Sequence, residues 1–305
     1  MEGFWIMRHE ALTDTYRRVV REQIRLSMDY CRRSDNEPDL ATHEIRKCTK
    51  RIRAINRLFR EVTGETACRH GQEQLRTISG MLSEHRASKV HIDILSEFET
   101  DKRLNLDRGL MLQLLNALQD GHLKLTAAIV EEDHRFQRVN TLLSDELNRL
   151  EDLPVSPCNF DKLERIFKES YLSGRKNLEV VQGHYSAENL HAFRKTVKSL
   201  WNQLSLIRPV WPSNVGMTVH FLDMLAERLG YDHDLHDLYQ YLSQERDVKN
   251  LVIPSHLLEY IDGKRKNLLK KITPLALRLF SEKPRSFSGR LATYYEIFSG
   301  EPIIM

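Results

Sequence analysis

The residues with the clearest chemical potential are histidine, arginine and lysine side chains that recur at one spacing in two distant segments. The first segment is His43-Glu-Ile-Arg-Lys-Cys-Thr-Lys50, and the second is His191-Ala-Phe-Arg-Lys-Thr-Val-Lys198. The two align without gaps as His-x-x-Arg-Lys-x-x-Lys. Arginine offers a planar fork of donors for phosphate oxygens, and lysine offers a mobile positive charge. The pattern therefore predicts binding of phosphate groups, and we assign no catalytic residue.

Both segments are expected to form amphipathic helices whose basic residues lie opposite an apolar stripe. Apolar residues recur every three or four positions from Ile45 to Val62 and again from Leu190 to Ile207. Solvated helix faces normally mix acids and bases, because like charges one turn apart repel. Two almost purely basic faces, with donors roughly 5–6 Å apart, predict a linear polyanion as ligand. The basic residues are His43, Arg46, Lys47, Lys50, Arg53 and Arg57 in the first helix, and His191, Arg194, Lys195 and Lys198 in the second.

Helical periodicity extends along nearly the whole chain and predicts an all-α fold. The 305 residues include only 13 glycines and 9 prolines, which is few for a chain of short strands and turns. The segment Leu153-Pro-Val-Ser-Pro157 is expected to end a helix near mid-chain. With the repeated motif, this break predicts two pseudo-symmetric four-helix bundles packed side by side, residues 1–152 and 158–305. Helices are expected over residues 10–33, 39–62, 73–84, 107–150, 162–182, 187–207, 215–229, 235–244 and 256–279.

The composition is that of a globular protein, with 41% hydrophobic and 29% charged residues and a net charge of +3. The four cysteines form no CxxC pair, so free thiols are expected. No apolar run approaches the roughly 20 residues of a membrane helix, and the first residues do not resemble a signal peptide. These features predict a cytoplasmic protein with no membrane partner.

The paired motifs and several later segments resemble the conserved histidine α-helical domain, or CHAD, family. Beyond the two His-x-x-Arg-Lys-x-x-Lys helices, Leu82-Ser-Glu-His-Arg86 and Pro209-Val-Trp-Pro212 are similar to segments of that family. So are the stretch from Leu225 to Leu235 and the segment Leu279-Phe-Ser-Glu-Lys-Pro284. The resemblance covers nearly the whole chain, and the order and number of the matching segments make it specific.

The resemblance implies binding of inorganic polyphosphate and association with polyphosphate granules. The chain departs from the family at Ala87, where an aspartate is usual, and it lacks the Glu-x-Glu-x-Lys motif of triphosphate hydrolases. Ser199 and Trp201 stand where the first motif has arginines, so we expect the first half to dominate affinity. The binding positions implied or added are His43, Arg46, Lys47, Lys50, Arg51, Arg53, Arg57, Arg86, His191, Arg194, Lys195 and Lys198.

Two other patterns resemble metal sites. The segment Asp232-His-Asp-Leu-His-Asp237 suggests a metal-dependent phosphohydrolase, but a helix start with Asp232 as its cap is the favoured interpretation. Glu131-x-x-His134 and Glu188-x-x-His191 match half of a di-iron pattern. Glu188, however, follows Ser186 in the first turn of a predicted helix, where an acid is favourable. We therefore assign no metal ligand and no cofactor.

Two alternatives concern the partner. A nucleic acid or an acidic protein would also fit a basic face, although the scattered aromatic residues do not form the stacking pattern of a single-strand binding surface. A second basic run, from Lys264 to Lys271, either extends the path of the anion or is a solvated face. Inorganic polyphosphate, or smaller phosphate and sulfate ions, remains the predicted ligand.

Overall fold

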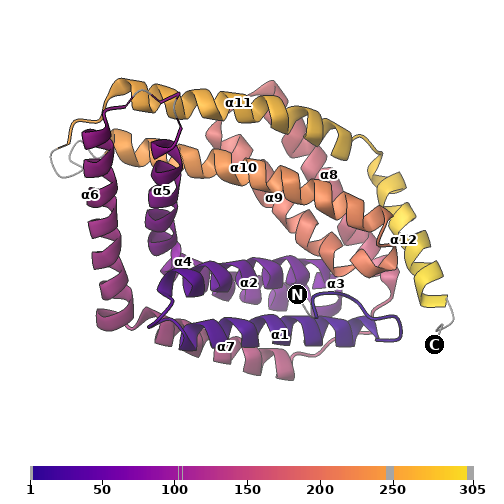
Figure 1. Cartoon of the computed structure of the whole chain (residues 1–305). Helices are drawn as coiled ribbons and strands as arrows, with labels where there is room; N and C mark the ends of the chain where they lie inside the picture. Colours follow the sequence, from indigo (N-terminus) through magenta and orange to yellow (C-terminus); the bar gives the residue numbers. More distant parts are fainter. Residues whose placement is uncertain (1–2, 102, 105, 245–250, 301–305) are drawn as a thin grey trace.

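The prediction of an all-α fold is confirmed by a computed structural model of the chain (Figure 1), which describes residues 3–101, 103–104, 106–244 and 251–300. These residues form twelve α-helices and no strand. One π-helical turn (Ala128–Glu132) follows α6, and one 3₁₀ turn (Arg208–Val210) follows α9. The helices are α1 (Leu12–Arg32), α2 (Pro38–Leu58), α3 (Arg60–Thr63), α4 (Glu65–Met81), α5 (Ser83–Glu99), α6 (Arg108–Ala127), α7 (Arg135–Asp152), α8 (Phe160–Gly183), α9 (Ala187–Leu206), α10 (Asn214–Gln244), α11 (Ser255–Leu279) and α12 (Pro284–Gly300).

Local sequence signals explain where several helices begin. Pro38 is the first residue of α2, a position at which a backbone N–H makes no hydrogen bond within the helix, so proline is favourable there. The Asp107 carboxylate accepts a hydrogen bond from the Leu110 N–H at the start of α6, at 2.9 Å. The Ser186 hydroxyl accepts one from the Asn189 N–H at the start of α9, at 3.1 Å. As predicted, the proline-containing segment near mid-chain separates two helices, α7 and α8.

Two hydrophobic cores hold the helices together, and each takes residues from both halves of the chain. The first core joins α1, α2, α4 and α7 to α8, α9, α12, the first part of α10 and the last part of α11. The second joins α5 and α6 to α11 and the last part of α10. The division into two four-helix bundles remains a prediction. The shared cores show that the two halves of the chain pack extensively against each other.

Several predicted helix boundaries are wrong. The helix expected over residues 73–84 begins earlier, at Glu65, where α4 starts. Most of α5, the part after residue 84, was not predicted. The single helix expected over residues 107–150 is interrupted by the π-helical turn and by His134, whose φ of 48° is left-handed. A left-handed residue cannot continue a right-handed helix, so α6 and α7 diverge there.

The expected helix start at Asp232 is also wrong, because this residue lies inside the uninterrupted helix α10. Buried leucines continue at helical spacing on both sides of the acidic segment, including Leu229, Leu235 and Leu238. Asp232 itself is tolerated in the helix interior because Arg265 of α11 pairs with it. The pairing residue is distant in sequence, so the local pattern did not reveal it.

The two helices that carry the repeated motif pack against each other. In Figure 1, α2 lies above α1 and below the pair α9 and α10, while α5 and α6 stand side by side at one end. The helix α2 contacts α9 and α5, and α9 contacts α10. Within the described residues, no helix is long and apolar enough to cross a membrane.

Candidate functional site

Seven of the predicted basic residues gather between α2, α5 and α9, and we call them the basic cluster. The helix α2 contributes three of them, α5 contributes Arg86, and α9 contributes three. Each member acts electrostatically on at least one other, across helices as well as along them. The cluster consists of His43, Arg46, Lys50, Arg86, His191, Arg194 and Lys198.

Lys50 lies at the electrostatic centre of this cluster. Burial, followed by the positive charges of Arg194, Arg46 and Lys198, lowers the pKa of Lys50 to about 7. Burial, followed by Arg86 and Arg194, lowers the pKa of Arg46. Burial also lowers the pKa of Lys198, although the nearby Asp223 acts in the opposite direction. At Lys50 the neighbouring cations add to the effect of burial, as expected where positive charges gather.

Lys50 is nevertheless reached by solvent, and its side chain is exposed. Arg46, Arg86 and Arg194 are each half-buried around it. Solvent therefore reaches the cluster at Lys50, and we call the space around this side chain, between α2, α5 and α9, the recess.

Two donors of the cluster are enclosed without a partner. Arg194 Nε and His191 Nδ1 are buried, and neither has a hydrogen-bond partner among the described residues. The His191 ring lies 4.4 Å from the ring of His233 on α10, centroid to centroid. Buried polar atoms are usually satisfied, by protein, water or ligand. These two atoms are thus candidates for contacts with a bound anion or its water.

Acidic residues of α10 lie near the cluster, a position that was not predicted from the sequence. Asp234 acts on Arg194, Arg86 and Lys50, and burial raises the pKa of its carboxyl. Burial, followed by the neighbouring Asp234, raises the pKa of Asp237 to about 6. The acidic segment of α10 was the available signal, but its position opposite α2 and α9 depends on tertiary structure.

We predict that Asp234→Asn increases affinity for a polyanion by roughly three- to tenfold, because it removes one negative charge from among three cations. The variant is also expected to be less stable without ligand, since those cations lose their counter-charge. Calorimetric titration and thermal unfolding measure the two effects. Weaker binding would contradict the prediction and would mean that Asp234 orients the arginines for the ligand.

Two other predicted site residues, Lys47 and Lys195, lie at the border of the cluster. Lys47 Nζ pairs with Glu44 at 2.9 Å on the same helix. Lys195 is exposed on α9 and acts on His191. Both therefore border the recess without belonging to its interior.

The remaining arginines of the first motif point elsewhere. Arg53 Nε donates to Gln72 Oε1 of α4 at 3.0 Å. Arg57 is exposed, with Nη1 3.5 Å from Ser199 Oγ of α9. They extend a basic strip along α2 beyond the cluster, and the structure does not bring them to Lys50.

Arg51 is buried, with 4% of its surface exposed. Its Nη1 donates to Gln23 Oε1 of α1 at 3.1 Å, and its guanidinium lies over the ring of Phe4. It acts on Lys198 at a distance. Arg51 is therefore placed to hold α2 against α1, and its predicted contact with the ligand remains a prediction.

The basic run at the start of α11 is largely paired with acids. Lys264 Nζ lies 3.2 Å from Glu97 and 3.3 Å from Asp101, and Lys266 Nζ lies 2.8 Å from Asp262. Paired charges attract an anion less than unpaired ones do. The positive charges of this run are therefore largely neutralised, and we do not include the run in the basic cluster.

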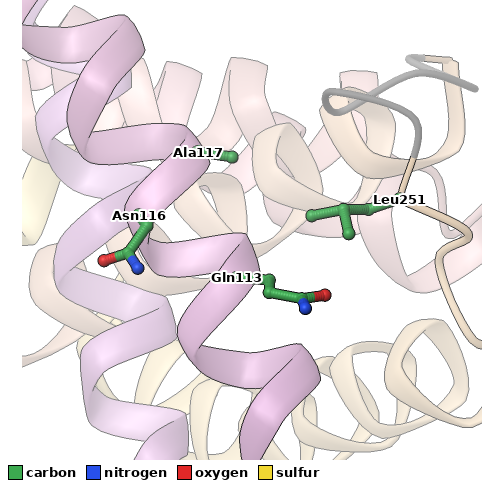
Figure 2. Close-up of a pocket in the computed structure, with 4 residues that line it drawn as sticks. All are labelled: Gln113, Asn116, Ala117 and Leu251. Carbon is green, nitrogen blue, oxygen red and sulfur yellow. The ribbon is translucent and has the colours of Figure 1, made fainter.

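A surface depression next to α6 does not coincide with the cluster. Figure 2 shows it between α6 and Leu251, with Gln113 and Leu251 pointing toward each other and Asn116 turned away. Its lining is apolar or amide in character and carries no charge. Since an anion site needs cationic donors, we regard the basic cluster as the candidate site.

Comparisons with known proteins identify the family of the chain. The family model of the CHAD domain matches residues 18–243, well over half of the chain and all of the basic cluster. The crystal structure of the CHAD domain from the plant Ricinus communis is similar in fold, with a TM-score of 0.60 at 16% identity, over 97% of this chain and 95% of that one. None of the curated proteins compared matches the sequence significantly. The chain therefore belongs to the CHAD family.

Proposed function

We propose that the chain binds inorganic polyphosphate through the basic cluster between α2, α5 and α9. The observation that carries the proposal is the convergence of seven basic side chains around Lys50, where burial, followed by the charges of Arg194 and Arg46, lowers the pKa of Lys50 to about 7. Like charges held this close destabilise the free protein. A polyanion that enters the recess would remove this repulsion and gain the stabilisation in return.

A linear chain of phosphates suits the cluster better than a single phosphate. The cationic groups come from three helices and extend over about two turns of α2 and of α9, on which successive donors are roughly 5–6 Å apart. Arg46, Arg86 and Arg194 offer planar forks, and Lys50 and Lys198 offer point charges. Association with polyphosphate granules would follow from this affinity and is part of the proposal.

Calorimetric titration with long-chain polyphosphate at two salt concentrations tests the proposal. Counterion release predicts that affinity falls steeply with salt, by roughly 10³-fold between 50 and 200 mM if about six phosphates are contacted. Orthophosphate at equal total phosphate is the control and should bind far more weakly. Binding that does not respond to salt would contradict the proposal. Equal competition by single-stranded DNA would replace it with a general polyanion site.

The affinity is expected to depend on pH through Lys50. In the free protein the pKa of Lys50 is about 7, and a bound polyanion must raise it, so binding takes up a proton above that pH. Affinity should be full below pH 7 and should fall as pH rises, by up to tenfold per pH unit for one coupled proton. Titrations from pH 6 to about pH 9 measure this. The Lys50→Gln variant should bind more weakly with a flatter profile, and an unchanged slope in it would contradict the assignment to Lys50.

A further inference from the structure

Three potential metal ligands converge at the end of the molecule where α2, α5 and α6 meet. Asp39 lies in the first turn of α2, His85 near the start of α5, and His122 near the end of α6. Asp39 Oδ1 is 3.0 Å from His122 Nε2 and 3.4 Å from His85 Nε2. The three ligand atoms all lie within 4.8 Å of one another. No sequence pattern indicated this group, because its members come from three separate helices.

The geometry points to a site for a divalent transition-metal ion of the zinc class, bound by Asp39, His85 and His122. Ligand bonds of about 2.0–2.2 Å in a tetrahedral site place the ligand atoms roughly 3.3–3.5 Å apart. The two carboxylate–imidazole distances are already close to this value. The two imidazole rings lie beside each other, with 4.8 Å between their centroids.

One oxygen of Asp39 is buried without a hydrogen-bond partner in the described part of the chain, which supports a bound ligand at this place. Asp39 Oδ1 is buried and has no hydrogen-bond partner among the described residues, although both imidazoles are near it. It therefore lies off the line along which each ring nitrogen would donate a hydrogen bond. A metal ion between the three groups would accept the lone pairs of both rings and of the carboxylate together.

Hydroxyl groups hold the far side of both rings, as outer-shell partners do in metal sites. Thr42 Oγ1 lies 2.9 Å from His85 Nδ1, and Ser88 Oγ lies 2.8 Å from His122 Nδ1. With the hydrogen on Nδ1, each ring keeps the Nε2 lone pair for a metal. Thr126 Oγ1 donates to the His122 carbonyl oxygen, so it accepts from His85 Nε2 at 3.0 Å. Metal binding would replace this contact and leave the hydrogen of the ring on Nδ1.

Access to the site and the types of its ligands also suit a metal. The side chain of Asp39 is 38% exposed, which leaves a path from solvent. Three ligands of this type fit zinc, or iron(II), better than magnesium or calcium.

Metal titration of the full chain tests the site without polyphosphate. After treatment with chelator, we expect the protein to bind about one equivalent of Zn²⁺ or Co²⁺, with visible Co²⁺ bands typical of nitrogen and oxygen ligands. His122→Gln and Asp39→Asn should each lower the affinity at least 100-fold, and Ser88→Ala about tenfold. Zn²⁺ should raise the Tm of the wild type but not of the first two variants.

His91→Gln is the matched control, since His91 is a buried histidine on the same helix, α5, outside the site. It should bind Zn²⁺ as the wild type does. A Cys158→Ser background removes the one cysteine that is not buried. Failure of the wild type to bind, or equal binding by His122→Gln, would overturn the inference. Since the probe is the metal alone, either result is independent of polyphosphate binding.

Discussion

A variant in which Lys50 and Arg194 are both replaced by glutamate is expected to lose measurable polyphosphate binding, with affinity at least 10³-fold below that of the wild type. Each residue acts on the other, and each belongs to one of the two motif helices. The change turns two attractive charges into two repulsive ones inside a recess where solvent screens them less than at a surface. Calorimetric titration measures the loss, and circular dichroism checks that the helices remain.

The matched control is Lys168→Glu with Lys176→Glu, which makes the same change in net charge. Both lysines are exposed on α8, a helix that carries no member of the basic cluster. This control should keep most of the affinity, with a loss within about threefold from the weaker long-range field. An equal loss in both variants would mean that net charge, and not the cluster, determines binding.

Arg265→Met is expected to lower the free energy of unfolding by about 3–5 kcal/mol, the usual effect of breaking a buried ion pair. Arg265 Nε donates to Asp232 Oδ1 at 3.1 Å, and the two residues are 9% and 2% exposed. Without Arg265 the Asp232 carboxylate would be buried and uncompensated. Denaturant unfolding measures the loss, which should shrink at lower pH as Asp232 becomes protonated.

The adjacent Lys266→Met provides the control for this variant. Lys266 is exposed and pairs with Asp262 one turn away on the same helix. Exposed pairs of this kind contribute little, so the change should stay within about 0.5 kcal/mol. Adding Asp232→Asn to Arg265→Met should recover part of the stability. A nearly neutral Arg265→Met variant would show that the pair does not stabilise α10 against α11.

The sequence was sufficient to predict the fold class and most of the basic cluster. Helical periodicity and one gapless repeat identified α2 and α9, and opposite apolar stripes indicated which faces were basic. These are local properties of a helix, so they survive in the folded protein. Arg46, Lys50 and Arg194 accordingly lie together as the repeat suggested.

What the sequence could not predict depends on contacts between distant segments. Helical periodicity gives only the angle of Arg51 and Arg53 around the axis of α2. Their surroundings depend on contacts with α1 and α4, which lie elsewhere in the sequence. Asp232 resembled a helix cap until Arg265, on another helix, explained its burial. The pattern of a single sequence does not contain such pairings. The predictions for Arg51, Arg53 and Asp232 were incomplete for this reason.

The length of α10 has a consequence for how the molecule unfolds. Its 31 residues form one helix of roughly 46 Å, whose first part belongs to one hydrophobic core and whose last part belongs to the other. Neither core can come apart without releasing part of this shared helix. The two halves of the chain should thus melt in a single cooperative transition, and amide hydrogens in the middle of α10, beside Asp234, should be among the slowest to exchange.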